Sequence, residues 1–462
     1  MSNPHVARWN ERLAPYVRRA TNPRPLVVEG KLSRMVGLTL ESVGCQAAIG
    51  DRCHIVRSGG STVEAEVVGF AEERLLLMPI GDVRGLAPQS RVVPFGRSGH
   101  MPVGAGLMSR VLSGTGEPLD NLGPLRDVQR VPMLSKAINP LERRPISEPL
   151  DVGVAGINSL LTIGQGQRLG LFAASGVGKS MLMGMMTRFT DADVAVVGLI
   201  GERGREVNEF IHNVLGPDGM SRAVVVASPA DDPPLMRIHG AHLATSIAEY
   251  YRDQGLNVLL LMDSLTRYAQ AQREVALAIG EPPATRGYPP SVFARLPQLV
   301  ERAGNGDERG GSITALYTVL VEGDEANDPV ADSARAILDG HIVLSKALAD
   351  RGHYPAVDIE GSVSRVFTTV ASEAQQAHAR EFRRLYATYS RNEDLVTVGA
   401  YSPGSDPQLD RAITMHPRLM SFLAQDMRQK VDLNESTQRL AALVAPPSEP
   451  VPAVPGGLAV TA

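Results

Sequence analysis

Residues 169–185 read LGLFAASGVGKSMLMGM: an apolar strand, a turn of small residues that ends in Gly-Lys-Ser, and a helix. From Ala173 to Ser180 the chain matches the phosphate-binding loop pattern, a Gly or Ala followed by four residues and Gly-Lys-Ser/Thr. Such small residues let backbone N–H groups turn inward around a polyphosphate, and the helix that begins near Gly178 adds its positive dipole end. The alternative is an ordinary glycine-rich turn, but the flanking strand and helix favour nucleotide binding.

Length and composition restrict the class of protein. A chain of 462 residues is too long for one compact core, so we expect two to four domains. The formal net charge of −4 gives no global attraction to nucleic acid or anionic lipid. Cys45 and Cys53 are too few for a disulfide framework and are expected to be small buried hydrophobes in a reducing cytosol. No apolar run reaches the roughly 20 residues that span a bilayer, which predicts a cytoplasmic protein.

The N-terminal part of the chain changes character near residue 25. Residues 5–19 place Trp9 and other apolar side chains on one helical face, which predicts an amphipathic arm. This arm could dock on a partner or a membrane surface, or pack on its own domain, and the sequence leaves both open. Short β-branched and apolar runs from 25 to 93 predict a small barrel or sandwich. They lack an aromatic stacking platform with interleaved basic residues, which disfavours oligonucleotide binding.

Alternating strands and helices follow a Pro- and Gly-rich stretch at 94–149. Five apolar strands are predicted, RLGLFA, DVAVVGLIG, RAVVVAS, NVLLLMD and SITALYTVL. Apolar strands separated by helices indicate a parallel sheet covered on both faces, with phosphate ligands at its carboxyl edge. From 374 to 444 the spacing is helical, in one segment with Phe382, Leu385, Tyr386 and Tyr389 and another with Leu419, Met420, Leu423 and Met427.

Four side chains, two in the phosphate loop and two at strand ends, carry candidate chemistry. Lys179 would reach the β- and γ-phosphates of a nucleotide, and the Ser180 hydroxyl would bind Mg²⁺. Asp263 ends the strand NVLLLMD as in a Walker B motif and would hold the same metal ion, although buried strands often end in Asp for structural reasons. Glu202 follows another strand, where a carboxylate can polarise water for attack on the γ-phosphate. A surface ion-pair cluster with Arg203 is the equal alternative for Glu202.

Several further segments, in the same order along the chain, are shared with one known family. They are GERGREVNEF (201–210), LLLMDSLTRYAQAQRE (259–274), PPATRGYPPSVFARLPQLVERAG (282–304), DPVADSARAILDGHIVLS (328–345) and RGHYPAVDIEGSVSRV (351–366). With the phosphate loop, they resemble the hexameric rotary-ATPase family related to the catalytic subunit of ATP synthase. Within it the chain is most similar to the flagellum-specific export ATPase and the type III secretion ATPase of injectisomes. The resemblance covers about residues 25–440.

The resemblance implies a role for individual residues. Glu202 is then the catalytic carboxylate and Asp263 the Walker B acid. Tyr354 would line the adenine pocket, where an aromatic face stacks on the base, and Arg365 would reach across a subunit boundary as an arginine finger. The remaining expected site residues are the phosphate-loop positions Ser175, Gly176, Val177, Gly178, Lys179 and Ser180, and Arg203 and Arg267 at the phosphate end.

Two features depart from the family pattern. Ala174 stands where many relatives have glycine, and its methyl group is tolerated only if φ there is negative. One chain also carries both the Glu202 element and the Arg365 element, whereas ATP synthase pairs catalytic with non-catalytic subunits. We therefore expect a homo-oligomer in which every interface can be active, a homohexamer by the family resemblance.

The predicted fold is a multidomain α/β protein with five parts. These are an N-terminal arm (1–24), a small β-barrel (25–95), a RecA-like P-loop ATPase core with a parallel sheet (96–373), a C-terminal helical domain (374–445) and a disordered Pro-rich tail (446–462). The implied cofactors are ATP and Mg²⁺.

The expected function is ATP hydrolysis that powers protein export through a flagellar apparatus by releasing or unfolding substrates. An injectisome ATPase is the main alternative, and a rotary ATP synthase subunit and a Rho-like RNA motor are weaker ones. Expected partners are a stator-like regulator on the arm, stalk and export-gate components and chaperone–cargo complexes, but no nucleic acid. The expected location is the cytoplasm, peripheral to the inner face of the cell membrane.

Overall fold

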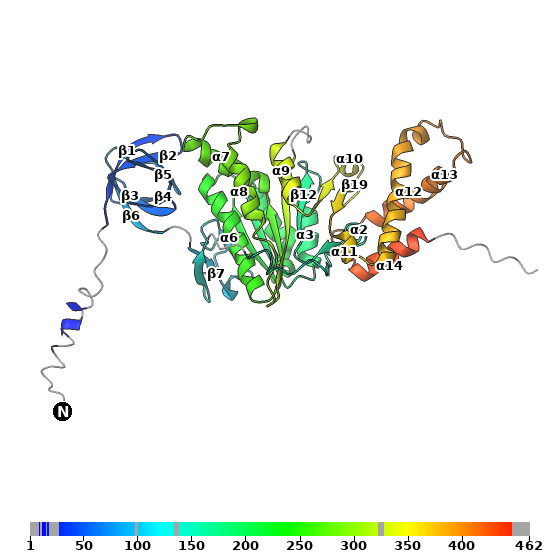
Figure 1. Ribbon diagram of the computed structural model, residues 1–462, viewed down its shortest axis with the longest axis horizontal. Coiled ribbons are helices and arrows are strands. Elements are labelled where there is room, and N and C mark those ends of the chain that lie inside the picture. The colour runs from blue at the N-terminus through cyan, green and yellow to red at the C-terminus, as the bar shows by residue number, and fades with distance from the viewer. Residues whose placement is uncertain are drawn as a thin grey trace, which may run out of the picture. The chain divides into compact units, whose positions relative to one another are not determined.

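The computed structural model describes residues 27–97, 100–133, 138–321 and 328–445, and near the N-terminus only positions 9, 12–14, 16 and 17. Most of the predicted arm and the whole predicted tail therefore lie outside the described residues. The chain divides into two compact units (Figure 1). One contains the chain up to His100 together with Glu274–Pro282, and the other contains Met101–Arg273 and the chain from Pro283 onward.

The first unit is built on a closed barrel, so the structure decides between the predicted barrel and sandwich. Its antiparallel strands follow the order β1-β2-β5-β4-β3-β6. They are β1 (Gly30–Val36), β2 (Thr39–Val43), β3 (Asp51–Val56), β4 (Thr62–Ala71), β5 (Arg74–Pro79) and β6 (Arg91–Arg97). Alternate side chains of these strands fill the interior, among them Leu40, Ile55 and Leu77, and Cys53 is buried there as expected.

A mostly parallel sheet forms the centre of the second unit. All five predicted strands are present, β12 (Arg168–Ala173), β13 (Val194–Ile200), β14 (Ala223–Ser228), β15 (Asn257–Asp263) and β17 (Ser312–Leu320). They lie parallel in the order β12-β17-β15-β13-β14. Nearly all their residues are buried, as apolar strands covered on both faces must be.

Further strands that the sequence pattern did not reveal extend this sheet. β8 (Val111–Ser113), from the Pro- and Gly-rich stretch, pairs in parallel with β14 at one edge. At the other edge β18 (Gly340–Leu344) pairs in parallel with β12, and β19 (Val357–Ser364) turns back antiparallel to β18. Because β19 runs antiparallel to β18, its carboxyl end lies beside the amino ends of the parallel strands. The phosphate loop lies at the opposite end of these strands, since it follows the carboxyl end of β12.

The remaining elements connect and cover the sheet. The strands are β7 (His100–Val103), β9 (Gln129–Pro132), β10 (Pro149–Leu150), β11 (Ile163–Gly164) and β16 (Gly304–Asn305). The helices are α2 (Ala155–Leu160), α3 (Lys179–Phe189), α4 (Gly204–Glu209), α5 (Gly216–Met220), α6 (Pro234–Asp253), α7 (Leu265–Ala278), α8 (Pro290–Val300), α9 (Pro329–Ile337), α10 (Lys346–Asp350) and α11 (Phe367–Val370), with short helical segments η1 (Ala105–Leu107), η2 (Phe210–Leu215) and η3 (Thr285–Gly287). Among the described residues, no helix is long and apolar enough to cross a membrane.

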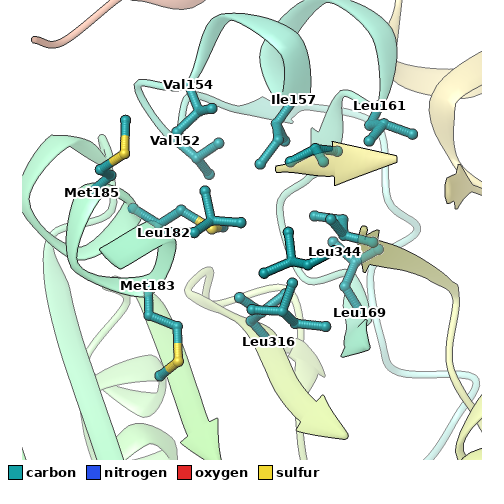
Figure 2. Packing of buried hydrophobic residues seen from close by; sticks show 14 of the residues in the cluster. Val152, Val154, Ile157, Leu161, Leu169, Leu182, Met183, Met185, Leu316 and Leu344 are labelled. Carbon is teal, nitrogen blue, oxygen red and sulfur yellow. The ribbon is translucent and has the colours of Figure 1, made fainter. Parts of the chain in front are cut away.

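The helix after the phosphate loop is anchored in the main core. Leu182 and Met185 of α3 point toward Val152 and Val154, which lead into α2 (Figure 2). Leu316 of β17 belongs to the same cluster of buried side chains. Burial of this helix face holds the first turn of α3 in place.

Three C-terminal helices complete the second unit, α12 (Glu373–Thr397), α13 (Pro407–Leu423) and α14 (Leu433–Val444). Their apolar residues join the same core as the sheet and α3. The helical spacing predicted for Met427 is wrong, because α13 ends at Leu423 and the chain turns extended at Ala424. This turn lets Gln425 hydrogen bond to the ATPase core instead of continuing the helix.

Replacing Phe382 of α12 with Ala tests this shared core. Phe382 is fully buried, so Phe382→Ala should lower the free energy of unfolding by about 3–5 kcal/mol. The matched control is Leu395→Ala on the same helix, where the side chain is 50% exposed and the cost should be below about 0.5 kcal/mol. Urea unfolding followed by circular dichroism measures both, and equal losses would contradict the assignment of Phe382 to the core.

Candidate functional site

The phosphate loop joins β12 to α3 with the backbone that the sequence pattern requires. Gly176 and Gly178 have φ of 81° and 92°, a region that side chains disfavour. Gly178 caps α3, so Lys179 and Ser180 occupy the first turn of the helix. Ala174 is not among the described non-glycine residues with positive φ. Its methyl group is therefore compatible with the loop.

Lys179 lies between two carboxylates that the sheet delivers to the same edge. Its Nζ is 2.7 Å from Oδ1 of Asp263 and 3.2 Å from Oε1 of Glu202. Asp263 ends β15 and Glu202 follows β13, and these strands are direct neighbours in the sheet. The side chains of Lys179, Asp263 and Glu202 are only 12%, 4% and 13% exposed, respectively. The structure thus brings together the residues that the sequence placed at three strand ends.

Burial and charge act against each other in this cluster. Burial alone would lower the pKa of Lys179, but the charges of Asp263 and Glu202 outweigh it and raise that pKa. Burial raises the pKa of Asp263 and of Glu202, and the attraction of Lys179 offsets only part of this rise. The ammonium of Lys179 therefore opposes the rise that burial imposes on the pKa of both carboxyl groups.

A hydroxyl hydrogen bond holds the Asp263 carboxylate, and backbone hydrogen bonds hold the segment that carries Glu202. Thr318 of β17 donates its hydroxyl proton to Oδ1 of Asp263 at 2.6 Å. Thr318 is not evident from sequence, where its only signal is a hydroxyl near the carboxyl end of an apolar strand. The Glu202 segment is tied to the chain after β14, since Gly201 N–H donates to Ser228 and Ala230 N–H donates to the Glu202 carbonyl. This support lets the two acids hold their positions beside Lys179.

The other residues expected near the phosphates differ in placement. Ser180 is exposed on the first turn of α3. Arg267, in the first turn of α7, packs over Gly201 and donates to Gln270 at 2.8 Å. Arg203 points into solvent, 84% exposed, with its nearest acid Glu206 at 3.7 Å. The surface ion-pair interpretation thus describes Arg203, while Glu202 turns inward to Lys179.

Tyr354 lies against the phosphate loop although it is far away in sequence. A Cβ built on Gly178 would be 3.3 Å from Cε1 of the Tyr354 ring. The Tyr354 hydroxyl donates to the carbonyl of Ala349 at 3.3 Å, and the residue is 47% exposed. A half-exposed aromatic face beside a phosphate loop can stack on a nucleotide base.

Arg365 does not join this cluster within one chain. It follows β19, and its backbone N–H donates to the carbonyl of Asp339, just before β18. This position is at the amino edge of the sheet, while the phosphate loop is at the carboxyl edge. The six residues of β12 separate the two edges by about 20 Å. The exposed Arg365 guanidinium donates to the carbonyl of Arg335.

Comparison with known proteins identifies the family. Residues 153–364 match the ATP synthase alpha/beta family, nucleotide-binding domain, and residues 371–442 match the T3SS EscN ATPase C-terminal domain. Over 437 residues the chain is 59% identical to the flagellum-specific ATP synthase of Pseudomonas aeruginosa, covering 94% of this chain and 97% of that one. The chain belongs to the family of flagellar and type III secretion ATPases. It is therefore an ATPase, as the family resemblance implied.

Other members of the flagellar and type III secretion ATPases show how widely the similarity extends. The type 3 secretion system ATPase of Xanthomonas euvesicatoria is 48% identical over 401 residues, which cover 87% of this chain and 90% of that one. The solved structure of the assembled ATPase EscN from enteropathogenic E. coli is 41% identical with a TM-score of 0.85, covering 90% of this chain and all of that one. These comparisons confirm the predicted barrel, parallel-sheet core and helical domain.

Removing the Lys179 cation should make stability depend on pH. In Lys179→Met, Asp263 and Glu202 stay buried without a cation, and their pKa values rise further. A carboxyl group with a raised pKa in the folded state stabilises the protein below its unfolded pKa, and this contribution disappears as pH rises through the folded pKa. The variant should therefore lose about 3 kcal/mol relative to wild type at pH 8 and clearly less at about pH 5.5.

Urea unfolding of the nucleotide-free protein at both pH values measures this loss. Lys179→Arg keeps a cation at the position and serves as the control, so its stability should follow the wild-type pH profile. A Lys179→Met deficit of the same size at both pH values would contradict the proposed electrostatic role.

Proposed function

We propose that this ATPase powers protein export through a flagellar type III secretion apparatus, by releasing or unfolding export substrates at its base. The flagellum-specific relative from Pseudomonas aeruginosa is more similar to the chain than the type 3 secretion relative from Xanthomonas euvesicatoria or EscN. This order of similarity supports the flagellar branch over an injectisome.

The observation that carries the proposed chemistry is the buried contact of Lys179 with Glu202 and Asp263. When ATP enters, its phosphates offer Lys179 a more strongly charged partner, and the Lys179 ammonium moves to the β- and γ-phosphates. Glu202 is thereby released to accept a hydrogen bond from water and orient it toward the γ-phosphate. The backbone N–H groups of residues 175–180 hold the phosphates. Arg203 and Arg267 are proposed to organise the phosphate end.

The donors in this site fit Mg²⁺. Ser180 offers an exposed hydroxyl at the start of α3, and Asp263 a buried carboxylate at the end of β15. Hydroxyl and carboxylate oxygens are the hard ligands that Mg²⁺ prefers together with phosphates. Bound Mg²⁺ would neutralise charge on the phosphates during transfer. Tyr354 is proposed to stack on the adenine base beside Gly178.

Arg365 supports a site shared between protomers. Because it lies at the opposite sheet edge from Lys179, it can reach a phosphate loop only in a neighbouring copy of the chain. Each chain carries both halves of the site, so a closed homohexamer gives six equivalent interfaces. EscN has been solved in an assembled form, and also in complex with its central stalk EscO. We propose that this chain assembles likewise around a stalk.

The remaining proposed partners follow from the export role. The N-terminal arm would bind a stator-like regulator, and the ring would meet export-gate components and chaperone–cargo complexes. The proposed location is the cytoplasm, peripheral to the inner face of the cell membrane. The net charge of −4 supports a role without nucleic acid and disfavours a Rho-like motor.

Glu202→Gln tests the catalytic assignment. The Gln amide keeps the shape of the Glu202 side chain, and its oxygen can still accept a hydrogen bond from Lys179. It is, however, a poor proton acceptor. ATP binding should remain within about threefold of wild type, while steady-state phosphate release should fall by roughly 10²–10⁴-fold. Hydrolysis at the wild-type rate would refute the role of Glu202.

The same Glu202→Gln protein, loaded with ATP, tests the flagellar role. Affinity capture from the native cell should recover flagellar export components. Recovery of injectisome components instead would refute the flagellar proposal, and recovery of RNA with RNA-stimulated ATPase activity would support a nucleic-acid motor.

A further inference from the structure

The loop between α13 and α14, residues 424–432, touches three separate parts of the nucleotide-binding core. Arg188, at the end of the phosphate-loop helix α3, donates to the carbonyl of Met427 at 2.7 Å. The Val431 N–H donates to the carbonyl of Gly153, before α2, at 3.2 Å. The backbone N–H of Gln425 donates to the carbonyl of Tyr354 at 3.0 Å. The loop between these C-terminal helices is thus hydrogen bonded to Tyr354, the residue expected to contact the adenine base.

Gln425 forms most of the bonds that hold this loop. Its Oε1 accepts from the N–H of Ala155 at 2.8 Å, and its Nε2 donates to the carbonyls of Gly153 at 2.8 Å and Gln429 at 2.7 Å. The side-chain amide therefore uses both its donor and its acceptor groups to clamp the loop to the start of α2. This clamp fixes the position from which the Gln425 N–H reaches Tyr354.

Apolar side chains also hold this loop, since Met427 packs against the main core and Val431 is only 1% exposed. An open pocket of about 560 Å³ lies between α13, α14 and the loop, and Phe422, Gln425 and Val431 help to line it. The loop is therefore held to the core by these apolar contacts together with the Gln425 hydrogen bonds.

We propose that Gln425 is a positioning residue for the nucleotide base, which holds Tyr354 against the phosphate loop through its hydrogen bond to the Tyr354 carbonyl. A shift of the C-terminal helices would then change the affinity for ATP without touching the phosphate chemistry. This inference rests on the proposed stacking of Tyr354 on the base. It assigns no catalytic step to Gln425.

Steady-state kinetics of the full-length chain test the proposal. Gln425→Ala should raise KM for ATP about three- to tenfold, because the three side-chain hydrogen bonds of Gln425 are lost, and should leave kcat within about twofold. In the Tyr354→Ala background, Gln425→Ala should produce no further rise in KM, since both changes act through one contact. A rise of the same size in that background would overturn the proposal.

Gln375 provides a matched control of the same residue type. Its Nε2 ties α12 to the core by donating to the carbonyls of Asn158 and Ser159 and to the Thr162 hydroxyl, at 2.8–3.2 Å. Gln375→Ala should lower the unfolding midpoint at least as much as Gln425→Ala but leave KM unchanged. An equal rise in KM for Gln375→Ala would show general loosening of the helices and overturn the proposal.

Two results distinguish a failure of the positioning role of Gln425 from a failure of the proposed stacking of Tyr354 on the base. If Tyr354→Ala leaves KM unchanged, the stacking role of Tyr354 fails and the inference fails with it. If Tyr354→Ala raises KM while Gln425→Ala does not, the base site stands and only the positioning role is overturned. Should Gln425→Ala not fold, Gln425→Glu keeps the acceptor for Ala155, loses both donors, and is expected to raise KM in the same way.

Discussion

The rest of the second unit depends on one electrostatic constraint, the burial of Lys179 between Asp263 and Glu202. Burial raises the pKa of two carboxyl groups that are 4% and 13% exposed, and the Lys179 ammonium at 2.7 and 3.2 Å opposes that rise. The parallel sheet supplies this geometry, because neighbouring strands β13 and β15 end at the same edge as the phosphate loop. Because charge holds Lys179 in place, its ammonium can exchange a carboxylate partner for the phosphates of ATP.

That exchange connects structure to activity. ATP would draw Lys179 toward its phosphates and leave Glu202 beside a water molecule, so binding and activation are two effects of one side-chain movement. The part of the site that would hold the adenine base depends on a different set of contacts. Tyr354 lies on a segment that is hydrogen bonded to the α13–α14 loop, so the C-terminal helices would influence affinity for ATP while the residues at the carboxyl ends of the strands would carry out the chemistry. In a ring, these helices would give a stalk or cargo a route to the nucleotide.

The sequence predicted the parts of this arrangement that local patterns encode. The five long apolar strands, the phosphate loop and Asp263 follow from composition and spacing, because fully buried strands need unbroken apolar runs. The strands β8, β18 and β19 were missed, since β8 has only three residues and β18 and β19 are only partly buried and lack an unbroken apolar run. The spacing also extended a helix to Met427, where tertiary hydrogen bonds of Gln425 end α13 instead. Thr318 and Gln425 act through contacts across 55 or more positions in sequence, which no local pattern records. Glu202 was ambiguous until the sheet placed it beside Lys179.

The central claim is that each active site takes Lys179 and Glu202 from one protomer and Arg365 from the next. Mixing Glu202→Gln with Arg365→Ala protein tests it directly, because each variant alone lacks one half of every site. Equal, random mixing in a closed ring pairs an intact Glu202 with an intact Arg365 at one interface in four, so ATPase activity should recover to roughly one quarter of wild type. Activity of the mixture no higher than the average of the two separate variants would contradict a shared site.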